Sequence, residues 1–206
     1  MVSTIYPSPS VELMRRALWV IFCMALFFYE CKVYDLASAA FVAVGLGLMA
    51  RGDWMGYGVA FAFGSINRET MGLLLLVFML HSWRHMSGRM WMAVFVYQAF
   101  LFLTVRICLM MIFASAPGAA FWLRPWENVL FFAQFPWLCG LHWVALGFVM
   151  WCCVRRWNQQ PRLLRSAFVV MMPALMVLYL VFGWAFEVRV FAELYPVVFA
   201  MMNAEW

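Results

Sequence analysis

Residues 90–114 read MWMAVFVYQAFLFLTVRICLMMIFA, and Arg106 is the one charged residue in this run. A helix needs about 20 apolar residues to cross the hydrocarbon core of a bilayer, so the run is long enough to span it. The whole chain has the same character: 68% of its 206 residues are apolar and 11% are charged, whereas a soluble globular domain carries roughly 25% charged residues. We therefore expect an all-α, polytopic bundle of transmembrane helices that forms a single integral membrane domain over residues 1–206.

The remaining apolar runs set the expected number of crossings. They cover residues 14–29, 36–50, 54–66, 71–80, 129–153 and 167–186, with a last stretch that ends at Met202. Residues 1–13 are more polar and are predicted to form a short cytoplasmic tail. No small-residue cleavage site follows the first run, so we interpret it as a membrane helix and not as a signal peptide. Together the runs predict about six or seven membrane segments.

Four polar residues, Asn67-Arg68-Glu69-Thr70, separate two runs that are each too short to cross the core alone. Basic loops are expected on the cytoplasmic side, as are Arg15 and Arg16. The loops at residues 81–89 and 155–165 both lie on that side only if the first of these two runs leads toward the outer face and the second leads back. This pattern predicts one broken or re-entrant helix near residues 67–70 in a multi-pass protein of the cell membrane. Irregular backbone at membrane depth must be shielded by protein or line a wet cavity.

With that orientation, a second set of residues, polar or charged, gathers at the outer face. It comprises Asn67, Arg68, Glu69, Arg106, Glu187, Arg189 and Glu193, together with Glu30 and Asp35. A charge at mid-bilayer costs roughly 2.5–3.5 kcal/mol on insertion scales, so Arg106 is expected to face a carboxylate or a polar cavity. The candidates for that carboxylate are Glu69, Glu187 and Glu193. If residues 189–193 are helical, Arg189 and Glu193 are four positions apart and can pair.

Two functions are consistent with these outer-face charges, and the sequence does not decide whether the protein is an enzyme. In the first, they form a site that acts on a lipid-linked or phosphate-bearing substrate, and glycosyl transfer is one candidate reaction. Glu69 and Glu187 are then the catalytic residues, because a carboxylate in a dry setting can act as a general base. The substrate-binding residues are Asn67, Arg68, Arg106, Arg189 and Glu193, because arginine binds phosphate through paired hydrogen bonds. In the second, the same charges are interhelical ion pairs in a non-catalytic subunit of a larger complex or in a small transporter.

The remaining polar residues indicate neither a metal nor another cofactor. The six cysteines show no C-x-x-C spacing. His81 and His85 are four positions apart and could share a helix face, but they belong to a basic loop that we interpret as a topology signal. For the same reason the net charge of +5 predicts no nucleic-acid partner. The expected partners are membrane lipids, a polyprenyl-phosphate-linked substrate under the first function, and other membrane subunits under the second.

Two segments also carry a family resemblance. Residues 64–70 read GSINRET, and residues 182–196 read FGWAFEVRVFAELYP. These N-R-E-T and E-x-R-x-F-x-E-L-x-P motifs, which extend from about Gly64 to Pro196, resemble a group of uncharacterised bacterial polytopic membrane proteins. That resemblance implies that the protein lies in a bacterial inner membrane and that the motif residues are important. A looser similarity, to membrane glycosyltransferases that use polyprenyl-phosphate sugars and place acidic residues on the outer face, implies glycosyl transfer.

Overall fold

The computed structural model describes residues 33–115, 125–134, 136–155, 157–182 and 188–203. Within these ranges the chain is all-helical, as predicted. The eight α-helices are α2 (Val33–Arg51), α3 (Trp54–Asn67), α4 (Gly72–Ser82), α5 (Gly88–Ile112), α6 (Pro125–Gln134), α7 (Pro136–Arg155), α8 (Arg162–Phe182) and α9 (Tyr195–Asn203). Three short 3-10 helices join them: η1 (Glu69–Met71), η2 (Trp157–Gln159) and η3 (Val188–Leu194). The predicted first helix at residues 14–29 and the predicted tail at residues 1–13 lie outside the described residues.

Three of the described helices, α2, α5 and α8, are long and apolar enough to cross a membrane. The longest is α5, which corresponds to the run predicted at residues 90–114. It begins two residues earlier than predicted because Ser87 caps it: the Ser87 hydroxyl accepts a hydrogen bond from the backbone N–H of Met90 at 3.4 Å. A serine in this position satisfies one of the free N–H groups of the first helical turn.

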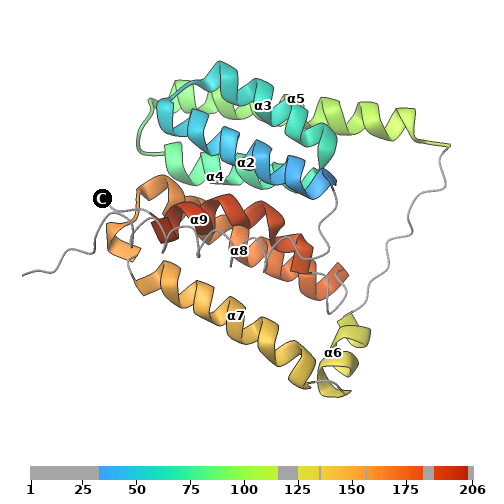
Figure 1. Ribbon diagram of the computed structural model, residues 1–206. Coiled ribbons are helices and arrows are strands. Elements are labelled where there is room, and N and C mark those ends of the chain that lie inside the picture. The colour runs from blue at the N-terminus through green and yellow to red at the C-terminus, as the bar shows by residue number, and fades with distance from the viewer. Residues whose placement is uncertain (1–32, 116–124, 135, 156, 183–187, 204–206) are drawn as a thin grey trace, which may run out of the picture.

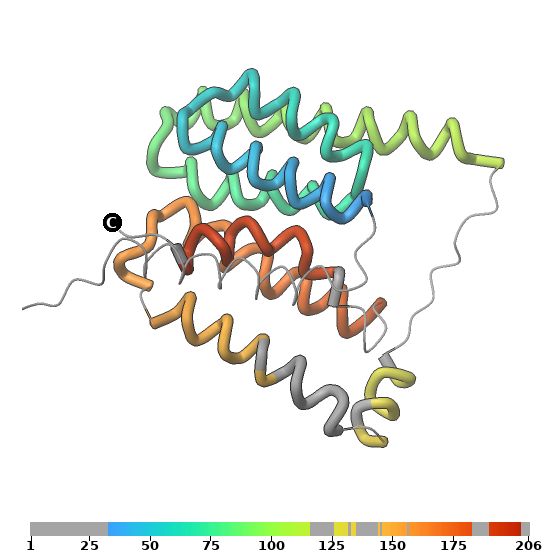
Figure 2. Tube along the Cα trace, in the orientation of Figure 1, coloured from blue at the N-terminus to red at the C-terminus, as the bar shows by residue number. Residues whose placement is uncertain are grey.

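The helices pack side by side in two groups (Figure 1). One group holds α2, α3, α4 and α5, and the other holds α7, α8 and α9. They meet where α4 packs along α8 and where α2 packs against η3 and α9. In Figure 2 the carboxyl-terminal half of α5 extends past the end of α3, and α6 turns away from α7. We refer to the two ends of the bundle as the Arg68 end and the His85 end, after residues in the turns that follow α3 and α4.

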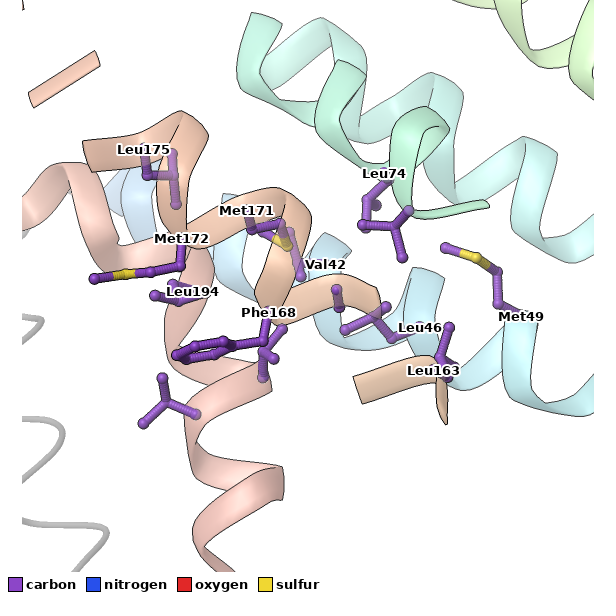
Figure 3. Packing of buried hydrophobic residues seen from close by; sticks show 14 of the residues in the cluster. Val42, Leu46, Met49, Leu74, Leu163, Phe168, Met171, Met172, Leu175 and Leu194 are labelled. Atoms are coloured by element: carbon purple, nitrogen blue, oxygen red, sulfur yellow. The ribbon is translucent and has the colours of Figure 1, made fainter. Parts of the chain in front are cut away.

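The interface between the groups is a stripe of apolar side chains at helical spacing. On α8 the buried positions recur every four residues: Leu163, Ala167, Met171, Leu175 and Tyr179. Figure 3 shows part of this stripe beside side chains of α2 and α4. Lipid tails are as apolar as leucine, so the hydrophobic effect does not drive helices together within a membrane. Such contacts hold helices together there by close van der Waals packing.

The break predicted at residues 67–70 is present. Arg68 has an extended backbone (φ −149°, ψ 144°) between α3 and η1, and α4 begins at Gly72. The chain reverses there, since the rings of Trp54 and Phe78 lie 5.4 Å apart and the Tyr57 hydroxyl donates to the carbonyl of Leu74 at 3.2 Å. Thus α3 and α4 are antiparallel, and the polar residues between them are gathered at one end of the bundle.

One expected helix is divided. The apolar run at residues 129–153 suggests a single crossing, whereas the structure has α6 and α7, with Pro136 as the first residue of α7. Proline suits a first helical position, because its missing N–H would have no partner there, but it disrupts the interior of a helix. The single-helix prediction is therefore wrong, and the second helix begins at a residue that suits a first helical position.

Candidate functional site

The centre of the Arg68 end is one guanidinium between two carboxylates. Arg68 Nη2 lies 2.9 Å from Asp35 Oδ1, and Nη1 lies 3.4 Å from Glu193 Oε1. Both carboxylate side chains are fully buried, while that of Arg68 is 22% exposed. The guanidinium carbon also lies 5.4 Å from the centre of the Tyr34 ring, which is within the range of a cation–π contact. These contacts join the start of α2, the break after α3 and the 3-10 helix η3.

Thr70 completes the environment of Glu193. Its hydroxyl donates a hydrogen bond of 2.5 Å to Glu193 Oε1, the same oxygen that faces Arg68. The other oxygen, Glu193 Oε2, is buried and accepts no hydrogen bond from the residues that the structure describes. A buried carboxylate is stabilised by such hydrogen bonds and by a paired cation, and loses much of its stabilisation if one is removed.

Asn67, the last residue of α3, links that helix to α2 by hydrogen bonds. Its side-chain amide donates to the backbone carbonyl of Tyr34 at 2.8 Å and to the Ser38 hydroxyl at 2.7 Å. The Ser38 hydroxyl in turn donates to the same carbonyl at 3.1 Å. The amide N–H groups are thus engaged within the protein.

A second ion pair lies beside this network. Arg106 Nη2 of α5 lies 2.6 Å from Glu69 Oε2, so the prediction that Arg106 faces a carboxylate is confirmed, and Glu69 is the partner. This pair is far more accessible than the first, because the Glu69 side chain is 66% exposed and that of Arg106 is 28% exposed. Of the predicted site residues whose side chains the structure describes, Glu69 and Arg106 are therefore the two that a molecule at the surface could reach most easily.

The other predicted residues are only partly described. Glu187 lies outside the described residues. Arg189 falls in η3, where the backbone is described but its side chain is not. Because η3 is a 3-10 helix, positions three apart share a face, so the four-residue spacing of Arg189 and Glu193 is not the repeat of this element.

Sequence reasoning missed three contributors. The Tyr34 carbonyl and the Ser38 hydroxyl accept hydrogen bonds from the Asn67 amide. The Thr70 hydroxyl donates one to Glu193. The sequence places Asp35 in the outer group but does not indicate that it is the partner of Arg68. Thr70 belongs to the N-R-E-T motif, which was a usable signal. Nothing in the sequence could indicate Ser38, because its role depends on how α2 packs against α3.

The chemistry available at this end is that of charge and hydrogen bonding. Within the described ranges no three His, Cys, Asp or Glu residues lie close enough together to hold a metal ion. Arginine, threonine and asparagine donors face carboxylate and carbonyl acceptors. Such a set can lock helices together, and where a pair stays exposed it can exchange its carboxylate for another anion.

Comparisons of the chain with protein-family models, with curated proteins and with solved structures return no match.

Proposed function

We propose that the chain is a multi-pass protein of the cell membrane, with six or seven membrane segments, and that it serves as a non-catalytic subunit of a larger membrane complex. The observation that carries this proposal is the closed network around Arg68. Both terminal nitrogens of the guanidinium face carboxylates, and the neighbouring amide of Asn67 is also engaged. A guanidinium whose two terminal nitrogens already face buried carboxylates serves to fix helices in place, and is less available to a substrate than an unpaired one.

The helix α5 supplies the surface for a partner. In its most apolar 18-residue window only 6% of the residues are buried, against 39% in α2 and in α8. Trp91 and Gln98 are its two buried residues. The exposed Glu69–Arg106 pair lies beside this helix. An ion pair against lipid tails is costly, whereas a protein partner with polar groups can satisfy it.

A photo-crosslinking experiment tests the subunit proposal in the native membrane. A crosslinking amino acid replaces Phe100 or Ile107, which are both exposed on α5. The matched controls are Val169 and Val177, which are exposed to a similar extent on α8. We expect the α5 positions to give adducts with a different membrane protein and the α8 positions to give lipid adducts. Lipid adducts alone from α5, or adducts only with a second copy of the chain, would contradict the proposal.

A second candidate function rests on the exposure of Glu69 and Arg106. The phosphate of a lipid-linked substrate could replace the Glu69 carboxylate beside the Arg106 guanidinium. Phosphate and carboxylate are both anions that accept paired hydrogen bonds from arginine. Glu69 would then be free to act as a general base toward a hydroxyl. Glycosyl transfer from a polyprenyl-phosphate sugar is the reaction that fits these roles, with Glu187 as a further predicted catalytic residue and Arg189 as a further predicted binding residue.

Binding of a polyprenyl phosphate to the purified protein separates this candidate from the first. Arg106→Gln should reduce binding relative to the parent if the Glu69–Arg106 pair is the site. Arg84→Gln, which removes an exposed arginine from the opposite end, should leave binding intact. Equal binding by the parent and by both variants would exclude the pair as a phosphate site.

A further inference from the structure

A group of basic side chains lies at the His85 end, between the last turn of α4 and the first turn of α8. The rings of His81 and His85 are 5.2 Å apart at an angle of 41°. Arg162, the first residue of α8, places Nη1 3.2 Å from Nε2 of His85. Residues 77 positions apart therefore converge at one point, and Figure 1 shows the turn after α4 and the start of α8 at the same end of the bundle.

The contact between Arg162 and His85 joins the turn after α4 to the start of α8. Arginine can only donate hydrogen bonds, so Nε2 of His85 is the acceptor in this contact. Nδ1 of His81 is buried and has no hydrogen-bond partner among the described residues. The group thus places the positive charge of Arg162 beside two imidazoles.

Arg165 extends the group along α8. It lies three positions after Arg162, a spacing that places both on one side of a helix. Its Nε is buried without a hydrogen-bond partner in the part of the chain that the structure describes. A guanidinium nitrogen that is shielded from water and unpaired costs free energy, which an incoming acceptor would recover.

The two ends of the bundle differ in how their arginines are paired. At the Arg68 end, Arg68 and Arg106 each have a carboxylate within ion-pair distance. Among the described residues, Arg162 and Arg165 have none. Asp53, near the end of α2, uses its carboxylate to accept the Gly56 N–H at the start of α3. Within the described ranges, no carboxylate at the His85 end therefore forms an ion pair with Arg162 or Arg165.

The amino-terminal end of α8 adds an electrostatic field that favours an anion. The helix is 21 residues long, and its first intrahelical hydrogen bond runs from the Arg165 N–H to the Pro161 carbonyl at 3.1 Å. The N–H groups of the preceding turn have no partner within the helix, and the helix dipole gives this terminus a partial positive charge. Anions bind readily at such a terminus when basic side chains also surround it.

We propose that His81, His85, Arg162 and Arg165 bind a phosphate group between α4 and α8. The phosphate is carried by a lipid headgroup or is free in solution, and both present the same oxygens to the forked guanidinium. Basic pockets between membrane helices bind phosphate-bearing headgroups by this chemistry. The inference is independent of the subunit proposal, because it concerns the opposite end of the bundle. It also differs from a topology signal, which needs the number of basic residues and not their geometry.

Thermal unfolding of the full chain in detergent tests the site. Inorganic phosphate is titrated against chloride at matched ionic strength. Separately, a short-chain phosphatidic acid is titrated against the diacylglycerol with the same chains, which differs only by the phosphate. We expect a saturable rise in Tm with at least one phosphate-bearing probe and none with its control. A rise with inorganic phosphate shows that the free ion suffices, and a rise with phosphatidic acid alone assigns the site to a lipid.

Matched variants separate a site from general attraction to basic residues. Arg162→Gln and His85→Gln should remove the rise, whereas Arg89→Gln, which replaces an exposed arginine in the first turn of α5, should keep it. Arg162→Lys keeps the positive charge but loses the forked guanidinium, so the apparent affinity for phosphate should fall by roughly tenfold. This variant tests the site even if Arg162→Gln does not fold. A saturable rise in neither series, or the same loss in Arg89→Gln as in the Arg162 variants, would overturn the proposal.

Discussion

The Thr70 hydroxyl donates a 2.5 Å hydrogen bond to Glu193 Oε1, although 123 positions separate the two residues in the chain. Arg68 reaches the same oxygen and also reaches Asp35. One oxygen atom thus links the turn between α3 and α4 to η3, and Arg68 links both to α2. Because a buried charge must keep its partners, this contact should be among the most sensitive in the molecule.

Replacing Glu193 should separate its charge from its hydrogen bonding. Glu193→Ala leaves Thr70 without an acceptor and creates a void, so we expect the free energy of unfolding to fall by about 3 kcal/mol. Glu193→Gln keeps an oxygen for Thr70, and Arg68 keeps Asp35, so the loss should be about half as large. Thermal or denaturant unfolding in detergent measures both. Equal losses in the two variants would show that the Thr70 contact contributes nothing.

Glu69→Gln should have a much smaller effect than Glu193→Ala. The Glu69 side chain is 66% exposed, and exposed ion pairs contribute about 0–1 kcal/mol. The two carboxylates therefore form a matched comparison, one exposed and one buried, within the same end of the bundle. The same unfolding assay decides the point, and a loss for Glu69→Gln as large as that for Glu193→Ala would be the opposite of what the exposures imply.

Helix class and the break at residues 67–70 could be predicted because each depends on local sequence. An apolar run such as residues 90–114 has one favourable conformation in a membrane, and the basic loops required the chain to reverse near Arg68. The pairing of charges could not be predicted. Arg106 had three candidate carboxylates, and the choice of Glu69 depends on how α5 packs beside α3 and α4. Asp35 was not assigned to Arg68, because nothing local indicates that the start of α2 lies beside the break.

Gly64 marks a close approach between helices, which leads to a third prediction. A Cβ at this position would overlap the Met71 side chain and would lie 3.1 Å from Cβ of Phe41 on α2. The terminal methyl of Met71 would have to move within a fully buried site, and Cβ of Phe41 has no such freedom, so Gly64→Ala should cost about 1–3 kcal/mol of stability. Gly47→Ala is the matched control, since a Cβ there meets nothing within 4 Å. Unfolding that is unchanged for Gly64→Ala, or equally reduced for both variants, would contradict the role of this approach.

His81 should make stability depend on pH. Burial lowers the pKa of His81 below its ordinary value of 6.5, and the nearby charges of His85 and Arg162 lower it further. In the unfolded chain His81 regains the ordinary pKa, so between the two pKa values the unfolded state binds more protons than the folded state. The contribution of His81 to stability is therefore complete above about pH 7 and is lost as the pH falls below about 6.5 toward the folded pKa.

The measurement is unfolding of the parent and of His81→Gln between about pH 8 and about pH 5 in a buffer without phosphate. The parent should lose stability toward acid, and the variant should lose less over the same range, because it has no imidazole at position 81 to protonate. Arg162 faces His81 from α8, and Arg162→Gln should also flatten the dependence by removing one of the charges that lower the pKa. If the three proteins share one pH profile, the slope arises elsewhere in the chain, and the neutral imidazole at position 81 does not contribute to stability.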